Sequence, residues 1–247
     1  MHLGGKFQAC AFVQVGPTIR GAWQHCNFRA PRDAALDSPR GFRNNRRVKQ
    51  SIVTLDLEGV LTPEIWIAVA EKTGIKELRL TTREVPDYDV LMKGRLKILD
   101  AHKLTLSDIQ AVIATLGPLP GALEFLRTLR GFTQVIILSD TFEQFAQPLM
   151  RQLEWPTLLC HRLVVENDRI VNYQLRQSDQ KRKATAALKN LNYQVIAAGD
   201  SYNDTAMLIE ADHGFLFRAP ENVRREFSQF KAVEHYADLL ALIKAVA

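Results

Sequence analysis

Cysteine is scarce in this chain of 247 residues, and its apolar runs are short. The three cysteines, Cys10, Cys26 and Cys160, are an odd number without the spacing of a metal-ligand motif, which argues against a disulfide scaffold and against a zinc site. No apolar stretch approaches the ~20 residues that cross a bilayer, and the N-terminus lacks the apolar core of a secretory signal. We therefore expect a cytoplasmic protein with no membrane contact.

The net charge of +5 is unevenly distributed along the chain. Residues 1–50 hold nine Lys and Arg against two Asp, whereas residues 51–247 hold 23 basic and 25 acidic residues. The basic character belongs to the leader, so we expect no nucleic-acid partner for the rest. The leader lacks periodicity and is predicted to be poorly ordered. It fits a basic arm, an organelle presequence, or upstream sequence outside the working protein with translation starting near Val48, and we favour the last.

One stretch organises the remainder, Ser51-Ile52-Val53-Thr54-Leu55-Asp56-Leu57-Glu58-Gly59-Val60-Leu61. Its β-branched run predicts a buried parallel strand that ends in two carboxylates and a glycine. Ligands of open α/β sheets bind beyond the carboxyl ends of strands, which places Asp56 at the rim. We expect the chain to bend after Asp56, as Gly59 permits, so that Asp56 and Glu58 share one pocket. A strand ending in a solvated turn has the same composition, and this stretch alone does not decide between the two.

Two later strands also end in polar residues. The strand over 133–138 leads into Ser139-Asp140-Thr141, and the strand over 194–198 leads into Gly199-Asp200-Ser201-Tyr202-Asn203-Asp204. Helical patterns at 121–129, 142–153, 183–191 and 237–247, a hairpin over 163–175 and a strand at 214–217 complete an alternating series. The pattern predicts an α/β fold with a Rossmann-like doubly wound parallel sheet, whose polar strand ends converge at one edge.

Between Asp56 and Ser139 lie 82 residues, far more than one crossover connection needs. They contain three consecutive helical patterns with no strand between them: one from Pro63 to Gly74 in which Trp66 packs, one over 88–102, and one after Ser107 with Gln110 completing a capping box. We interpret residues 64–116 as a small inserted helical cap domain, and 51–63 with 117–247 as the core. A cap suits chemistry that excludes water in one step and admits it in the next.

The polar clusters predict one site with a shared chemistry. Several carboxylates cannot crowd together ionised without a cation, which implies an oxygen-liganded ion, and magnesium fits best. A serine hydroxyl and a lysine in the same place suit the oxygens of a phosphoryl group. The residues concerned are Asp56, Glu58, Ser139, Asp200, Asn203 and Asp204, with one of the basic run Lys181-Arg182-Lys183. They favour phosphoryl transfer.

At this point the sequence resembles a known family. The order D-x-E-G, then serine, then lysine, then G-D-S-x-N-D resembles the haloacid dehalogenase-like phosphatase superfamily. The stretches D-L-E-G-V-L-T-P-E-I-W, P-D-Y-D-V-L-M-K, L-S-D-T-F and A-A-G-D-S-Y-N-D-T are similar to its bifunctional phosphoserine phosphatase and homoserine phosphotransferase members. The likeness covers residues 51–247. It implies phosphoserine and homoserine as substrates, Mg²⁺ as cofactor, and no particular oligomeric state.

The resemblance also implies a role for each site residue. Asp56 would be the nucleophile and Glu58 the general acid and base. Magnesium would be held by Asp56, the main-chain carbonyl of Glu58, and Asp200, with Asp204 in support. The remaining residues would bind substrate: Ser139 and Lys181 at the phosphoryl oxygens, Asp140 and Asn203 along the site, Glu64 at the ammonium group and Arg95 at the carboxylate.

Alternatives remain open at this point. Most members of the superfamily have Asp where this chain has Glu58, which leaves the partition between water and an alcohol acceptor undecided. The substrate is phosphoserine or another small phosphorylated metabolite. A phospho-receiver signalling domain uses similar residues, but the 82-residue gap argues against it. His102 and His161 are expected to be surface or hairpin residues and not ligands.

Overall fold

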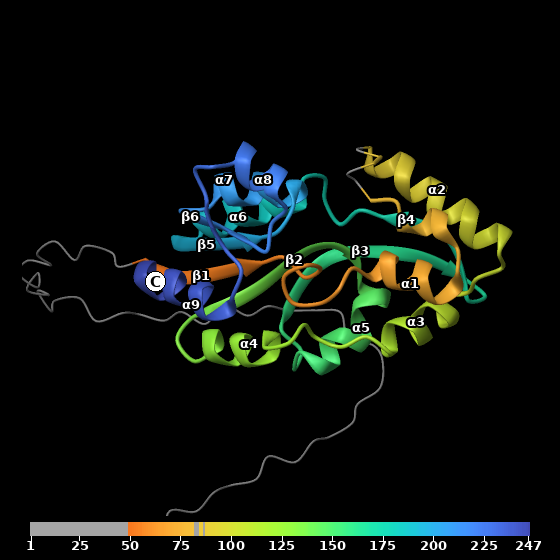
Figure 1. Ribbon diagram of the computed structural model, residues 1–247, viewed down its shortest axis with the longest axis horizontal. Helices are drawn as coiled ribbons and strands as arrows, with labels where there is room; N and C mark the ends of the chain where they lie inside the picture. Colours follow the sequence, from red (N-terminus) through yellow and green to blue (C-terminus); the bar gives the residue numbers. More distant parts are fainter. Residues whose placement is uncertain (1–48, 82–83, 86) are drawn as a thin grey trace, which may run out of the picture. The chain divides into compact units, whose positions relative to one another are not determined.

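Apolar and β-branched residues build one sheet, and the strand that leads to Asp56 lies at its centre. The computed structural model describes residues 49–81, 84–85 and 87–247. In this part of the chain the strand order is β4-β3-β2-β1-β5-β6-β7 (Figure 1). Their bounds are β1 Gln50–Leu55, β2 Gln134–Phe142, β3 Thr157–Glu166, β4 Arg169–Gln174, β5 Tyr193–Gly199, β6 His213–Phe217 and β7 Lys231–Val233. The predictions about the leader concern residues 1–50, of which 1–48 lie outside the described residues, while Gln50 already belongs to β1.

The order of the strands reverses at β1. This strand pairs in parallel with β2 on one side and with β5 on the other. The sheet continues in parallel from β2 to β3 and from β5 through β6 to β7, and within the described sheet only β3 and β4 are antiparallel. The predicted α/β class with a doubly wound parallel sheet is confirmed. A reversal of strand order opens a crevice beyond the strand ends, here beside the end of β1.

Helices cover both faces of the sheet (Figure 1). On one face lie α4 (Ala122–Arg130), α5 (Glu143–Gln152) and α9 (Tyr236–Val246), and on the other lie α6 (Gln180–Asn190), α7 (Thr205–Glu210) and α8 (Glu221–Glu226). The apolar faces of α4 and α5 are buried in the main core, which explains why their 3.6-residue period was legible in the sequence. The short elements α7, α8 and β7 were not predicted, because so few residues carry no clear period.

Helices α1 (Ile65–Thr73), α2 (Tyr88–Ala101) and α3 (Leu106–Ala114), with the 3₁₀ turn η1 (Lys76–Arg79), follow β1, and the described residues between them form no strand. Their contacts with the β3–β4 hairpin include two hydrogen bonds. The Tyr173 hydroxyl donates to Oδ1 of Asp89 at 2.6 Å, and the Leu106 N–H donates to the Asp168 carbonyl at 2.8 Å. The assignment of 64–116 as a separate cap domain stays a prediction.

Two local expectations need revision. Helix α3 begins at Leu106, so its capping box consists of Thr105 and Asp108 and not of Ser107 and Gln110. Its early start is stabilised by the Leu106 N–H bond to the hairpin turn, while the Gln110 side chain donates to the Gln144 carbonyl instead. The apolar segment at 157–160 and the first strand of the predicted hairpin are one continuous strand, β3, which pairs with β2 at one end and β4 at the other.

None of the helices in the described part of the chain combines the length and the apolar character that a membrane crossing requires.

Candidate active site

A tight turn follows β1 and carries the two carboxylates of the sequence motif, Asp56 and Glu58. Asp56 comes directly after the strand, is almost fully buried, and donates its backbone N–H to the Ala198 carbonyl of β5 at 3.1 Å. The chain then turns back, with the N–H groups of Leu61 and Thr62 both donating to the Leu57 carbonyl. Gly59 has φ +78°, a conformation that costs side-chain-bearing residues strain. The chain therefore bends at the predicted place.

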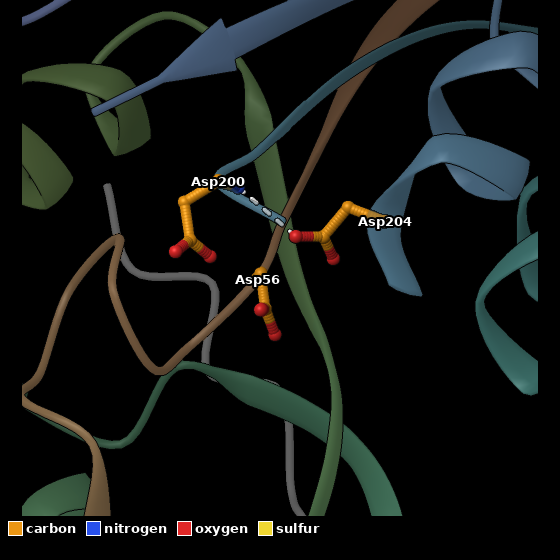
Figure 2. Close-up of side chains that lie close together, drawn as sticks. All are labelled: Asp56, Asp200 and Asp204. Atoms are coloured by element: carbon orange, nitrogen blue, oxygen red, sulfur yellow. Dashed lines mark hydrogen bonds between the residues drawn. The ribbon is translucent and has the colours of Figure 1, made fainter. Parts of the chain in front are cut away.

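Strand β5, which pairs with β1, leads to two more carboxylates at this point. After β5 the chain passes through Asp200 and the 3₁₀ turn η2 (Tyr202–Asp204). Asp204 is completely buried, and its Oδ2 accepts the N–H groups of Asp200 and Ser201 at 3.0 and 3.1 Å. Carboxylate oxygens of Asp56, Asp200 and Asp204 lie within 4.8 Å of one another (Figure 2).

Lys181 supplies positive charge to this cluster. It lies in the first turn of α6, is 3% exposed, and its Nζ is 2.9 Å from Oδ1 of Asp56 and 2.7 Å from Oδ1 of Asp204. Burial opposes its charge, but the surrounding carboxylates outweigh burial and raise the pKa of Lys181. Within the basic run, Arg182 pairs with Asp179 and Lys183 donates to Ser178. Lys181 is the member of the run that reaches the site.

The electrostatics of the cluster are unbalanced. Burial and the neighbouring Asp204 and Asp200 raise the pKa of Asp56 well above its usual range, against the lowering effect of Lys181. One lysine cannot neutralise three carboxylates that lie this close together. Their oxygens are the donor atoms that a hard divalent cation prefers. The residues therefore fit a bound magnesium ion, which would be held by Asp56, Asp200 and Asp204.

The end of β2 adds Ser139 and Asp140. Ser139 is buried, and its Oγ accepts the Thr141 N–H at 3.2 Å. Asp140 accepts hydrogen bonds from the side chains of Gln180 at 3.0 Å and Asn203 at 3.2 Å. Burial raises the pKa of Asp140, but Lys181 and hydrogen bonds from neighbouring side chains outweigh it and hold this pKa far below the usual range. Asp140 is therefore a fixed negative charge that orients donors on two other elements.

His161 belongs to this network: of the two expected places, surface or hairpin, it has the second, because it lies in β3, which pairs with β4. The imidazole is 4% exposed. Its Nδ1 accepts the Arg176 N–H at 3.2 Å, so the neutral ring carries its proton on Nε2, which lies 3.5 Å from Oδ1 of Asp140. Gln180, which the sequence did not single out, donates to both Asp140 and the Ser139 carbonyl. For His161 a signal was available in the sequence: it takes the place of an apolar residue in the alternation Leu159, His161, Leu163 along β3.

Glu58, Glu64 and Arg95 form a second group of charges. Oε2 of Glu58 accepts the Ile65 N–H at the start of α1 at 2.8 Å, and Glu64 is the N-cap residue of that helix. Burial, followed by the negative charge of Glu64, raises the pKa of Glu58 to about 7. Arg95 comes from α2 and is 7% exposed. Burial lowers the pKa of Arg95 to about 10, although Glu58, Tyr88 and Glu64 favour its charged form.

Both groups border a single cavity of about 730 Å³, a volume typical of small-molecule sites. Its lining includes every predicted site residue except Asp204, which lies buried against Lys181: Asp56, Glu58, Glu64, Arg95, Ser139, Asp140, Lys181, Asp200 and Asn203. The lining also includes Trp66, Tyr88, His161 and Gln180. The structure thus brings together residues that are far apart in the sequence, and their individual roles stay predictions.

A family model described as haloacid dehalogenase-like hydrolase matches residues 18–212. The chain belongs to this family. Its membership makes the protein a hydrolase and removes the case for a phospho-receiver domain. The site at the end of β1, with its carboxylates and lysine, is therefore the candidate active site of a haloacid dehalogenase-like hydrolase.

Two curated proteins are similar to this chain in sequence. A protein named phosphoserine phosphatase from Pseudomonas syringae pv. tomato is 67% identical over 189 residues, which is 76% of this chain and 80% of the relative. Phosphoserine phosphatase ThrH from Pseudomonas aeruginosa is also 67% identical over 189 residues, which is 76% of this chain and 92% of the relative.

Solved structures share the fold at low sequence identity. A phosphoserine phosphatase in apo form matches with a TM-score of 0.66 at 18% identity, over 81% of this chain and 100% of the other. A phospho-aspartyl intermediate analogue of phosphoserine phosphatase matches with a TM-score of 0.67 at 17% identity, again over 81% and 100%. At these identities the likeness shows a shared fold and not a substrate.

Proposed function

We propose that this hydrolase is a magnesium-dependent phosphoserine phosphatase that works through an aspartyl-phosphate on Asp56 and can also pass the phosphoryl group to homoserine. The observation that carries the proposal is the buried contact of Asp56 with Lys181 in a cavity that Glu64 and Arg95 also line. This cavity offers a nucleophile with a nearby cation, together with one charge of each sign. The 67% identity to two named phosphoserine phosphatases supports the same substrate.

In the first proposed step a carboxylate oxygen of Asp56 attacks phosphorus, and the bond from phosphorus to the seryl oxygen breaks. Glu58 donates its proton to that oxygen, and serine leaves. A pKa near 7 suits this task, because the group can hold a proton near neutral pH and release it when needed. Lys181 and Ser139 would bind the phosphoryl oxygens, as donors for the charge that spreads over them.

In the second proposed step Glu58, now a carboxylate, takes a proton from water or from the hydroxyl of homoserine. The oxygen thus activated attacks phosphorus, and the bond to Asp56 breaks, so that inorganic phosphate or phosphohomoserine is released and Asp56 is restored. Magnesium bound by the acidic cluster would neutralise negative charge on the carboxylates and on the phosphoryl group.

Substrate selection would follow from the second group of charges. Glu64 would meet the ammonium group of phosphoserine and Arg95 its carboxylate, in the bidentate manner that a guanidinium permits. Both residues border the same cavity as Asp56. Serine and homoserine share these two groups and differ by one methylene, so the same pair could receive either one. Another small phosphorylated metabolite is the alternative substrate.

The test is to incubate the full chain with phosphoserine and Mg²⁺, with and without homoserine, and to measure inorganic phosphate together with phosphohomoserine by mass spectrometry. The proposal expects phosphate release, and phosphohomoserine at the expense of phosphate when homoserine is present. Release of phosphate alone would refute the transferase activity and leave the phosphatase. No turnover of phosphoserine would refute the substrate assignment.

A further inference from the structure

We infer that Trp66 is a positioning residue for Arg95, and that the pair sets the preference of the site for phosphate esters that carry a carboxylate. The inference rests on the proposed function, because it takes Arg95 as the group that meets the carboxylate of phosphoserine. It assigns a role to a tryptophan that the sequence motifs explain only as packing.

The two side chains are stacked within the cavity lining. The guanidinium carbon of Arg95 lies 4.4 Å from the centroid of the Trp66 ring. Trp66 is 8% exposed and is itself fixed by an edge contact with Phe145, with ring centroids 5.4 Å apart at an interplanar angle of 72°. A guanidinium covered on one face by an aromatic ring is attracted to that face and offers its donors along its edges. The stack therefore fixes the plane of the guanidinium group, and with it the plane in which Arg95 can bind a carboxylate.

The hydrogen bonds of Arg95 leave part of that edge available. Nη2 donates to the Leu80 carbonyl at 2.7 Å, and Nη1 has a long contact of 3.6 Å with the Met92 sulfur. Nε has no hydrogen-bond partner among the described residues. Nε is covered by the surrounding protein, so a ligand carboxylate in the cavity would bind at the Nη groups, where Nη1 has, among the described residues, only the long contact to sulfur. The main-chain bond to Leu80 holds one end of the group while Trp66 holds its plane.

Trp66 also counters a competing attraction. Glu58 and Glu64 favour the charged form of Arg95, so a mobile guanidinium would tend to pair with these carboxylates of the enzyme. Stacking on Trp66 provides a neutral surface that stabilises the cation without neutralising it. Trp66 is the second residue of α1 and follows Glu64 by two positions, so one helical turn presents both the acid for the ammonium group and the platform for Arg95.

The test uses Trp66→Phe, which keeps an aromatic face, against Trp66→Leu and Trp66→Met, which keep bulk without one. Steady-state kinetics of the full chain are measured with phosphoserine and with 4-nitrophenyl phosphate, which has no carboxylate. The aliphatic variants are expected to raise KM for phosphoserine about tenfold, with kcat changed less than about twofold, and Trp66→Phe to restore most of the affinity. Trp155→Leu serves as a control, because Trp155 is 61% exposed and does not line this cavity.

A double-mutant cycle separates positioning from general support of the fold. If Trp66 acts through Arg95, then Trp66→Leu added to Arg95→Ala raises KM for phosphoserine by no more than about twofold beyond Arg95→Ala alone. Multiplying effects would overturn the inference, as would an equal rise of KM for 4-nitrophenyl phosphate. If the wild-type chain does not turn over phosphoserine at all, the proposed function fails and the inference with it. If the wild type turns over phosphoserine and the aliphatic variants match it, the inference alone fails.

Discussion

Gly59→Ala is predicted to damage metal binding far more than folding, because Gly59 lies against the carboxylate of Asp200. A Cβ at Gly59 would lie 2.5 Å from Oδ2 and 2.8 Å from Oδ1 of Asp200, closer than Cβ atoms come to non-bonded atoms in folded proteins. The Asp200 side chain would have to move, and Asp200 is one of the three carboxylates of the acidic cluster. We expect the Mg²⁺ concentration for half-maximal activity to rise roughly tenfold or more, the range seen when neighbours of metal ligands are disturbed.

Gly74→Ala is the matched control. Gly74 ends α1 with φ +73°, close to the +78° of Gly59, but a Cβ there would meet nothing within 4 Å. A side-chain-bearing residue in the left-handed region costs about 1–2 kcal/mol, so urea denaturation should show a similar loss of stability in both variants. Activity as a function of Mg²⁺ concentration should separate them. If Gly59→Ala responds to Mg²⁺ as Gly74→Ala does, Asp200 is not a ligand held in place by contact with Gly59.

Three further outcomes are expected. Lys181→Met leaves Asp56 and Asp204 without their buried cation, so the free energy of unfolding in EDTA should fall by about 3–5 kcal/mol. Mg²⁺ should restore part of this loss. An equal loss with Mg²⁺ present would contradict a shared cation site. Burial raises the pKa of Cys160 to about 11 from 9.0. At pH 8 its alkylation by iodoacetamide, followed by peptide mapping, should therefore be about 100-fold slower than that of an ordinary thiol, because the thiolate is the reactive form. Labelling at the rate of an ordinary thiol would refute this. Thr54 is buried and its Oγ1 has no partner among the described residues, so Thr54→Val should raise the free energy of unfolding by up to about 1 kcal/mol, and a loss of stability in urea would show that the hydroxyl is paired.

The parts of the site that the sequence predicted are those that depend on runs of neighbouring residues. A β-branched run that ends in polar residues predicts a strand with chemistry at its end, and the parallel order of β1, β2 and β5 brings Asp56, Ser139 and Asp200 to one edge. The doubly wound sheet follows from the alternation of strand and helix and is confirmed. The same logic could not choose among Lys181 and its two basic neighbours, because the choice depends on where α6 begins.

The missing parts depend on contacts between distant elements. His161 approaches Asp140 because β3 lies beside β2, and Gln180 arrives from a helix that follows the hairpin. Trp66 of α1 meets Arg95 of α2, a contact between two helices that the spacing of residues along the chain does not reveal. In each case the sequence gives no sign of a polar or charged partner, and the fold supplies one.

The central claim is that Asp56 becomes phosphorylated during turnover, and acid quenching tests it most directly. The full chain is mixed with phosphoserine and Mg²⁺, quenched within the turnover time, digested and analysed by mass spectrometry. The account predicts one added phosphoryl group on the peptide that contains Asp56, which disappears when phosphoserine is exhausted and is absent from Asp56→Asn. Phosphoserine hydrolysis that proceeds without this peptide being labelled, or that survives in Asp56→Asn, would contradict it.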